Sequence, residues 1–263
     1  MQIVRLDSVE STNKYCEVLD LAEVEDFTCY WALEQTAGIG QRGNHWHSAP
    51  GENLTFSLVL HPSWLPADLQ FRLTQALSLA VTDFLSALPL RQGESPKGKG
   101  VGIKWPNDIY VGDHKICGTL VSTRLSTHAI KQSSNQAIIA SAIAGIGLNI
   151  NETVFPDWVP NPTSLYLLTG RSYDLEEALH TLLQCIEHRY QALHDDADFE
   201  SEYLALLLGR GEQRQYVYRS QPLTATIEGV DEYGRLLLTT ADDSSICCNM
   251  KEIQYIFSEA DTK

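Results

Sequence analysis

Hydrophobic and polar positions divide the chain into strands and helices. Residues 1–9 alternate apolar and polar side chains, which predicts a strand, and residues 27–35 and 53–62 are rich in β-branched and aromatic residues. Residues 68–88 instead place apolar side chains three and four positions apart. That spacing predicts a helix whose apolar face belongs to the core.

Three further segments predict helices. Ser11 offers an N-cap hydroxyl for a helix that we expect to run to about Val24. Asp174, with a glutamate three residues later, begins a long amphipathic stretch of helical period. Residues 198–208 predict the third helix, ended by Gly209.

The middle of the chain contains the remaining strands of the main fold. Strands are predicted over residues 101–105 and 109–122, the second interrupted by a turn at Gly112 and Asp113. Residues 137–151 form a continuous apolar run, which is typical of a strand buried on both faces. Strands and helices in this mixture indicate the α+β class.

The last part of the chain has a different texture. From about residue 211, short alternating strands and turn residues follow one another, which predicts a small β-barrel of roughly 50 residues. We therefore expect a catalytic domain over residues 1–210 and a C-terminal domain over residues 211–263.

The amino-acid composition limits the kinds of molecule that the protein is expected to bind. The formal net charge is -15, and nucleic acids and anionic membranes are bound through basic surfaces, so neither partner is expected. The six cysteines include no CxxC pair, which indicates reduced thiols and neither a zinc site nor a disulfide framework. The N-terminus lacks the apolar region of a signal peptide, and about 18 consecutive apolar residues occur nowhere. We expect a cytoplasmic protein.

Residues 34–46, EQTAGIGQRGNHW, carry the first candidate chemistry. The segment satisfies GxGxxG, but Pro50 and Gly51 lead into another strand, leaving no room for the helix of a dinucleotide-binding site. A glycine-rich loop this long between strands favours a ligand, because glycines let backbone N–H groups approach closely. Arg42 is a candidate to neutralise a phosphate or carboxylate. The indole of Trp46 is suited to either of two places, the wall of a ligand pocket or the hydrophobic core.

Two further segments carry polar side chains at strand ends. Residues 104–118, KWPNDIYVGDHKICG, cluster two lysines, an amide and a carboxylate around a strand-turn-strand unit, which suits an anionic substrate and a metal-bound nucleotide. Residues 145–151, GIGLNIN, end the buried strand with Asn149 and Asn151 on the same side by period two, and glycines within a strand indicate close approach of a ligand or another backbone. His45 and His47 are also two positions apart. Without further metal ligands, a pair of this kind lies more often on the protein surface than in a metal site.

Together, STN at 11–13, the glycine loop, KWPND at 104–108, KICG at 115–118 and GIGLNIN resemble the biotin protein ligases in order and spacing. The resemblance covers the whole main domain. It implies a mixed sheet with helices, like that of the class II aminoacyl-tRNA synthetases, and a C-terminal SH3-like barrel. Because STN begins at residue 11, the chain resembles the monofunctional enzymes, which lack an N-terminal helix-turn-helix domain.

The resemblance implies a two-step reaction. Biotin and Mg-ATP give biotinyl-5'-adenylate and pyrophosphate, and a lysine of a biotin carboxyl carrier domain then attacks the mixed anhydride. It assigns biotin binding to Ser11, Thr12, Asn13, Gln35, Gly38, Ile39, Gly40, Gln41, Lys115 and Gly118. It assigns ATP and adenylate binding to Arg42, Gly43, Trp46, Lys104, Asn107, Asp108 and Asn149. Lys115 and Arg42 are the catalytic candidates, and Asp108 is the candidate ligand for Mg²⁺.

The chain departs from the family at one place. The family loop commonly reads Gly-basic-Gly-Arg, whereas Ile39 and Gln41 stand at the two basic positions here. We hypothesise that Arg42 takes over part of the charge and that Ile39 acts through its backbone; unchanged adenylate retention and rate in Arg42→Ala would exclude that role for Arg42. A lipoate ligase, which shares the fold, and a non-catalytic biotin or nucleotide sensor remain open alternatives. Whether the chain forms a homodimer is also open.

Overall fold

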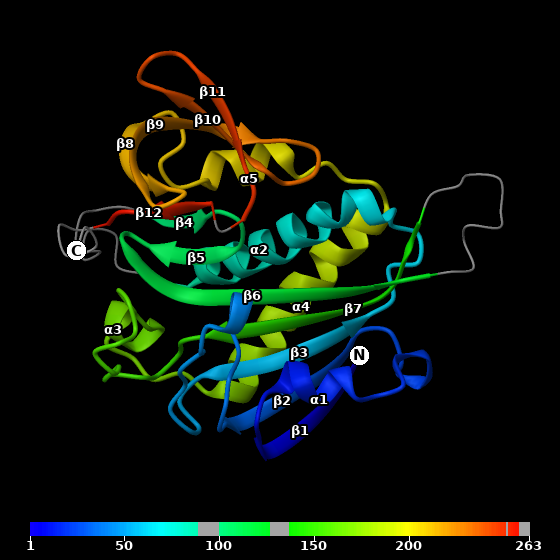
Figure 1. The fold of residues 1–263 in the computed structure, drawn as a ribbon. Helices are drawn as coiled ribbons and strands as arrows, with labels where there is room; N and C mark the ends of the chain where they lie inside the picture. Colours follow the sequence, from blue (N-terminus) through cyan, green and yellow to red (C-terminus); the bar gives the residue numbers. More distant parts are fainter. Residues whose placement is uncertain (89–99, 127–136, 251, 258–263) are drawn as a thin grey trace.

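A seven-stranded mixed sheet forms the centre of the molecule (Figure 1). The computed structural model describes residues 1–88, 100–126, 137–250 and 252–257. The strand order is β1-β2-β3-β7-β6-β5-β4; β1 and β2 are parallel, and all other neighbours are antiparallel. The strands are β1 (Gln2–Val9), β2 (Thr28–Gln35), β3 (Leu54–Leu60), β4 (Val101–Lys104), β5 (Asp108–Val111), β6 (His114–Leu125) and β7 (Ile139–Leu148).

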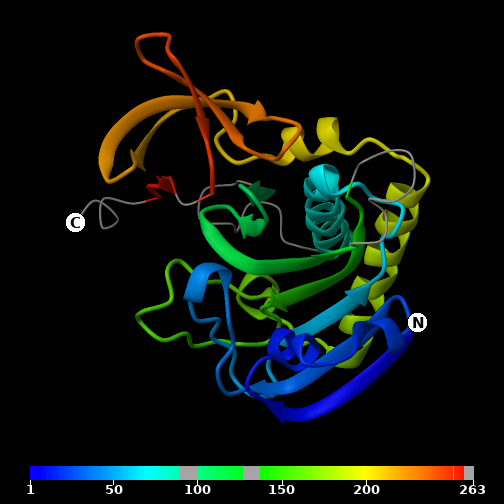
Figure 2. The same ribbon diagram turned by 45° about the vertical axis from the view of Figure 1, so that its right-hand side comes forward.

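Two long helices cover one face of this sheet (Figures 1 and 2). They are α2 (Gln70–Ala87) and α4 (Leu175–His194), which pack against each other and against the large apolar core. The predicted α4 cap is confirmed, since the Asp174 carboxylate accepts a hydrogen bond from Glu177 N at 2.9 Å. Alternation along the strands explains the division of faces: Leu58 and Leu60 of β3 join the core under the helices, whereas Val59 joins a second cluster on the other face.

The first helix is shorter than the sequence indicated. The predicted run to about Val24 is wrong: α1 (Thr12–Glu17) ends after six residues, and the 3-10 turn η1 (Leu21–Glu23) follows. The break occurs because Asp20 accepts a hydrogen bond from Ala22 N and starts a new turn, which buries Leu21. The remaining short elements are η2 (Gln41–Gly43), η3 (Ala67–Leu69), α3 (Leu165–Thr169) and α5 (Glu200–Leu206).

A second, antiparallel sheet follows α5, in agreement with the SH3-like barrel expected at the C-terminus. Its strand order is β11-β10-β9-β8-β12. The buried side chains of both sheets form one continuous cluster, so the division at residues 210 and 211 stays a prediction. The strands are β8 (Gln213–Tyr218), β9 (Gln221–Val230), β10 (Leu236–Thr240), β11 (Ser245–Cys248) and β12 (Ile253–Tyr255).

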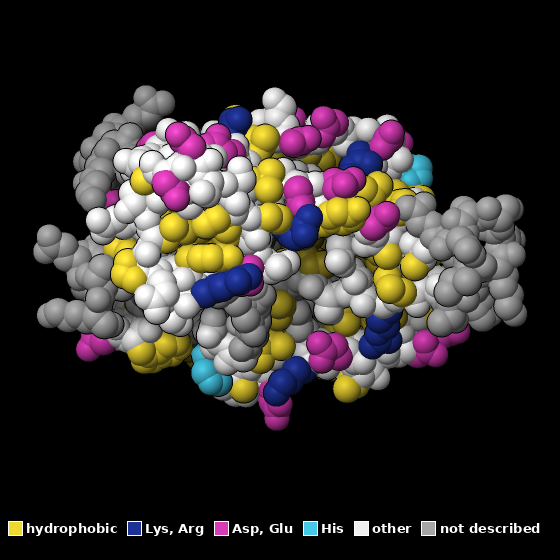
Figure 3. Space-filling model, turned by 45° about the horizontal axis from the view of Figure 1, so that its top comes forward, with side chains coloured by type: hydrophobic (Ala, Val, Ile, Leu, Met, Phe, Trp, Pro, Cys, Tyr) yellow, Lys and Arg dark blue, Asp and Glu magenta, His cyan; other side chains and the backbone are white. Residues whose placement is uncertain are grey.

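The surface agrees with the composition. On the face shown in Figure 3, lysine and arginine side chains lie apart from one another, several of them beside acidic ones, and do not gather into a basic patch. Among the helices of the described residues, none has the length and apolar character needed to cross a lipid bilayer.

Candidate active site

Glycines on β6 and β7 form the floor of the site, on the sheet face opposite α2 and α4. Strand register aligns Gly145 of β7 with Ser57 of β3 and Leu120 of β6, and it aligns Gly147 with Gly118. Residues directly opposite in neighbouring strands point to the same face. The two rows therefore lie side by side and leave space above the sheet.

Side chains fill part of that space. A Cβ at Gly145 would overlap the amide of Asn13, and a Cβ at Gly147 would overlap the indole of Trp46. A Cβ at Gly118 would lie 3.0 Å from the same indole. The sequence predicted that a ligand or another backbone approaches the β7 glycines; the structure shows that the side chains of Asn13 and Trp46 do so.

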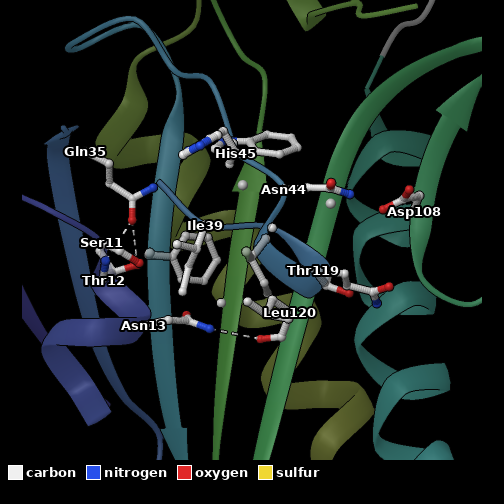
Figure 4. A pocket seen from close by; sticks show the side chains of 18 of the residues that line it. Ser11, Thr12, Asn13, Gln35, Ile39, Asn44, His45, Asp108, Thr119 and Leu120 are labelled. Carbon is white, nitrogen blue, oxygen red and sulfur yellow. Dashed lines mark hydrogen bonds between the residues drawn. The ribbon is translucent and has the colours of Figure 1, made fainter. Parts of the chain in front are cut away.

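Polar groups from α1, β2 and β3 form one end of the site (Figure 4). Gln35 ends β2, and its Oε1 accepts hydrogen bonds from Thr12 N at 2.7 Å and from Thr12 Oγ1 at 3.2 Å. Ser57 bridges Thr12 and Asn13 at 2.7 and 2.5 Å, and Asn13 Nδ2 donates to Leu120 O at 3.3 Å. These bonds fix the Gln35 amide so that its nitrogen remains available as a donor.

The glycine loop folds back on itself over the site. Trp46 N donates to Gly38 O at 2.9 Å, Gly40 N donates to Asn44 O at 2.7 Å, and Ile39 pairs with His45. The tip is the short turn η2, in which Gly43 has a φ of 85°, a conformation that favours glycine. The backbone of Arg42 is part of η2, but its side chain lies outside the described residues.

The KWPND segment is the turn between β4 and β5, and it meets the glycine loop. Gln41 Nε2 donates to Asn107 Oδ1 at 3.0 Å, and Asn107 Nδ2 donates to Thr119 O at 2.9 Å. The peptide bond between Trp105 and Pro106 is cis. A hydrogen bond thus joins Gln41 of the loop to this turn.

Residues from the C-terminal part of the chain make hydrogen bonds to the same KWPND turn. Trp105 Nε1 donates to Gly234 O at 2.9 Å, and the hydroxyl of Tyr203 in α5 donates to Pro106 O at 2.7 Å, both in buried surroundings. The position of the turn therefore depends on residues 97 and 129 positions later in the chain.

Replacing Tyr203 with phenylalanine is expected to lower the free energy of unfolding by about 1 to 2 kcal/mol, because Pro106 O loses its buried donor. Urea denaturation measures the change. Tyr233→Phe serves as the control, since that side chain is 56% exposed. Equal effects of the two substitutions would contradict the prediction.

Two lysines surround one carboxylate beside this turn. Lys115 Nζ lies 2.8 Å from Asp108 Oδ1, and Lys104 Nζ lies 3.7 Å from Asp108 Oδ2. Burial lowers the pKa of Lys104 below its usual value; Asp108 opposes this shift and Lys115 adds to it. Lys115 also lies over the Trp46 ring at 5.5 Å, and Lys104 lies over the ring of Tyr255 in β12 at 5.3 Å. Two lysines beside one carboxylate leave this cluster with a net positive charge.

Two adjoining cavities result. The first measures about 210 Å³, and the second about 390 Å³. Most of the predicted biotin residues line the first: Ser11, Thr12, Asn13, Gln35, Ile39, Gly40, Gln41, Lys115 and Gly118, together with Lys104 and Asp108. Gly43 and Asn149 line the second. Both cavities are lined by Asn44, His45, Trp46 and Lys115.

The second cavity combines apolar walls with two lining residues, Trp46 and Asn149, that each carry a buried polar atom without a hydrogen-bond partner among the described residues. Asn149 Nδ2 donates to Thr163 O at 2.9 Å, which directs Oδ1 the other way, and this oxygen is buried without a hydrogen-bond partner among the described residues. A buried acceptor of this kind is costly unless a ligand or water donates to it. The apolar wall consists of Phe155, Trp158, Val159, Pro160 and Pro162.

Some predicted residues lie just outside the cavities. Gly38 and Asn107 support the loop and the turn by hydrogen bonds. Asn151 does not share the orientation of Asn149: its Nδ2 donates to Tyr173 O at 2.9 Å. β7 ends at Leu148, so the alternation of a strand does not extend to these asparagines.

Several lining residues were missed by the sequence analysis. In the first cavity they are Asn44, His45, Phe56, Thr119, Leu120, Gly145, Ile146 and Gly147. Strand alternation from Gly118 predicts Leu120, and the β7 glycines belong to a segment for which the sequence predicts close approach of a ligand or another backbone. The segment over 155–162 follows no helical or strand period, so no sequence signal indicated that it forms a wall.

Comparisons with known proteins agree with this geometry. Residues 6–138 match the model of the biotin/lipoate A/B protein ligase family. The chain is 30% identical to the bifunctional ligase/repressor BirA of Bacillus spizizenii over 250 residues, covering 91% of this chain and 70% of that protein. It is 31% identical to the biotin–[acetyl-CoA-carboxylase] ligase of Paracoccus denitrificans over 245 residues, covering 89% and 92%.

Among solved structures, the biotin protein ligase from Aquifex aeolicus in complex with biotin and ATP superimposes with a TM-score of 0.72. The identity is 25%, and the match covers 96% of this chain and 97% of that one. The fold, the family model and the relatives lead to the same conclusion as the motifs. The chain belongs to the biotin/lipoate A/B protein ligase family and, within it, to the biotin protein ligases.

Proposed function

We propose that the protein attaches biotin to one lysine of a biotin carboxyl carrier domain, in two ATP-dependent steps. The observation that carries this proposal is the position of Lys115, which lines both cavities and lies at their junction. A molecule in the first cavity and a nucleotide in the second would meet there. The relative from Paracoccus is named as a ligase for acetyl-CoA carboxylase, which supports a carboxylase subunit as the acceptor.

The first cavity suits the head group of biotin. A ureido ring presents one carbonyl acceptor and two N–H donors, so its site needs both kinds of partner. Gln35 offers its amide nitrogen as a donor, because its oxygen already accepts from Thr12. The hydroxyls of Ser11 and Thr12 are buried and accept or donate as the ring requires. Ile39 and Leu120 supply apolar contacts for the rest of the molecule.

The second cavity suits an adenosine. Its aromatic and proline side chains offer flat apolar surfaces to a base. The unpaired Oδ1 of Asn149 accepts a hydrogen bond, and the exocyclic amine of adenine is a donor of the required kind. Trp46 lies between the two cavities and contacts both substrates in this arrangement.

In the first step, a carboxylate oxygen of biotin attacks the α-phosphorus of ATP. A C–O–P anhydride forms, the bond between the α-phosphorus and the bridging oxygen breaks, and pyrophosphate leaves with the electron pair. Two anions must approach each other, so fixed positive groups are needed where charge accumulates. Lys115 supplies this charge at the junction, and Lys104 adds to it from the KWPND turn.

Asp108 is the carboxylate available for Mg²⁺. Among the described residues no group of three or more His, Cys, Asp or Glu is arranged to hold a metal ion. A single carboxylate nevertheless fits, because Mg²⁺ is commonly held by one or two carboxylates together with substrate phosphates. When bound, the ion neutralises phosphate charge. Asp108 also keeps Lys104 and Lys115 oriented toward the junction.

In the second step, the ε-amino group of the acceptor lysine attacks the carbonyl carbon of the anhydride. An amide bond forms, the bond between the carbonyl carbon and the bridging oxygen breaks, AMP leaves with the electron pair, and the amine releases one proton to solvent. Before that attack the anhydride must be protected from water. The hairpin of the glycine loop covers the first cavity, and the bond from Gln41 to Asn107 holds its tip against the KWPND turn. This contact is the protein's means of retaining the intermediate.

Lys104→Arg is expected to extend activity to higher pH. Because burial lowers the pKa of Lys104, this lysine loses its proton at a lower pH than an exposed lysine does, and the rate falls with it. Arginine keeps its charge throughout the range. The alkaline limb of pyrophosphate exchange, measured at saturating substrates, should therefore move upward in the variant. If the alkaline limbs of the parent protein and the variant coincide, Lys104 does not control the rate.

Biotin-dependent exchange of pyrophosphate into ATP tests the first step. Transfer of biotin to a purified carrier domain, with a lysine-to-arginine carrier as the control, tests the second. We expect exchange with biotin and none with lipoate. Exchange with lipoate alone would assign the chain to the other branch of the family, and nucleotide binding without exchange would make it a sensor.

A further inference from the structure

Glu152 is a buried carboxylate that neither step above uses. It is 2% exposed, and its Oε1 accepts a hydrogen bond from His47 Nε2 at 2.7 Å. Its Oε2 accepts from Ala49 N at 3.2 Å and from the amide of Asn53. Asn53 is oriented by Ile150 N, which donates to its Oδ1 at 2.8 Å.

The partners of Glu152 occupy both of its carboxyl oxygens. Ala49 N and Asn53 Nδ2 are donors, and they match the acceptor Oε2. His47 Nε2 lies 2.7 Å from Oε1 and donates to it in the tautomer that carries the hydrogen on Nε2. Such a bond in buried surroundings fixes the plane of the imidazole ring.

The pair joins two segments that are far apart in the sequence. His47 directly follows Trp46, at the end of the glycine loop, and Glu152 lies three positions before Phe155, the first residue of the segment that walls the second cavity. The rings of His47 and Trp158 meet edge to face, with centroids 5.9 Å apart and planes at 86°. Trp158 is 59% exposed, so the contact with His47 restrains a side chain that is otherwise largely in solvent.

We propose that His47, held by Glu152, is a positioning residue for the nucleotide. It fixes the separation of Trp46 and Trp158 across the second cavity, and a base that packs between aromatic walls depends on that separation. This inference rests on the proposed function, which assigns the second cavity to adenosine. The biotin cavity has neither His47 nor Trp158 in its lining, and Trp46, which lines both cavities, is also held by its bond to Gly38 O, so we expect the pair to affect nucleotide affinity far more than biotin affinity.

Exchange kinetics of four variants test the proposal. His47→Ala and Trp158→Ala should each raise the KM for ATP about tenfold and leave the KM for biotin within about twofold. Because His47 acts through Trp158, the double variant should match Trp158→Ala alone, whereas independent residues would give additive effects. Glu152→Gln should stay within about threefold of the parent protein, since an amide of the same size still hydrogen-bonds the ring.

Controls separate positioning from general stability. His188→Ala removes an exposed histidine of α4 and should change neither KM. Thermal melting of each variant shows whether it is folded; an unchanged KM for ATP in a folded His47→Ala protein would overturn the inference. So would additivity with Trp158→Ala, or a Glu152→Gln effect as large as that of His47→Ala.

A binding measurement keeps this inference separate from the proposed function. Calorimetric titration with an ATP analogue carrying a methylene bridge between the α- and β-phosphorus reports nucleotide affinity without catalysis. Absence of exchange in the parent protein would contradict the proposed function only. Equal affinity of the parent protein and His47→Ala for the analogue would contradict the role of His47 only.

Discussion

Lys115→Met is expected to slow biotin-dependent pyrophosphate exchange by roughly a hundredfold or more, the usual effect of removing one group that stabilises a transition state. Lys115 lies at the junction of the two cavities, where the biotin carboxylate and the α-phosphate must meet. Methionine keeps the length and apolar part of the side chain and removes the charge. The loss should therefore appear mainly in kcat, because attraction to the charge grows as the new bond forms.

Lys14→Met is the matched control. Lys14 is 50% exposed and pairs with Glu10 on the surface of α1, so its charge lies outside both cavities. Its removal should leave exchange unchanged. If Lys115→Met retained the rate of the parent protein, the assignment of the catalytic charge to Lys115 would be wrong, and the junction would need another cation.

Gly145→Ala is expected to weaken biotin binding by roughly thirtyfold, which corresponds to about 2 kcal/mol. The added Cβ would overlap the Asn13 amide, so Asn13 must move. It would then lose its bonds to Ser57 and to Leu120 O, and these bonds hold the polar end of the first cavity. Equilibrium titration with biotin measures the change, and the affinity for ATP should be preserved.

Gly100→Ala is the control for this substitution. A Cβ at Gly100 meets no atom within 4 Å, so the same chemical change is made without an overlap. Normal biotin affinity in Gly145→Ala would show that Asn13 moves without cost. The polar end of the cavity would then not depend on the packing of Asn13 against the β7 glycine.

The departure from the family loop has a physical counterpart in the structure. Gln41 stands where a basic residue is common, and it contributes a hydrogen bond to Asn107 in place of a charge. Ile39 pairs through its backbone with His45 and lines the first cavity. The role that we hypothesise for Arg42 keeps its test by adenylate release, because its side chain lies outside the described residues.

Local patterns in the sequence determined most of the elements. The alternation that marks β1 and the helical period that marks α2 and α4 come from residues close together in the chain. The motifs also determined the family, since KWPND, KICG and the glycine loop keep their order and spacing. Periodicity did not predict the length of α1. The hydrogen bond from Ala22 N to the Asp20 carboxylate starts the separate turn η1 within the segment that the sequence predicts as one helix.

Only the tertiary structure decided how the site is assembled. Strand register places Gly145 and Gly118 in neighbouring rows, and the space above them is taken by Asn13 and Trp46. The wall at Trp158 has no periodic signal, and Trp158 contacts His47, whose carboxylate partner lies 105 positions later in the chain. Contacts between residues so far apart are fixed by packing of the whole chain, whereas periodicity reports only on neighbours within a few positions.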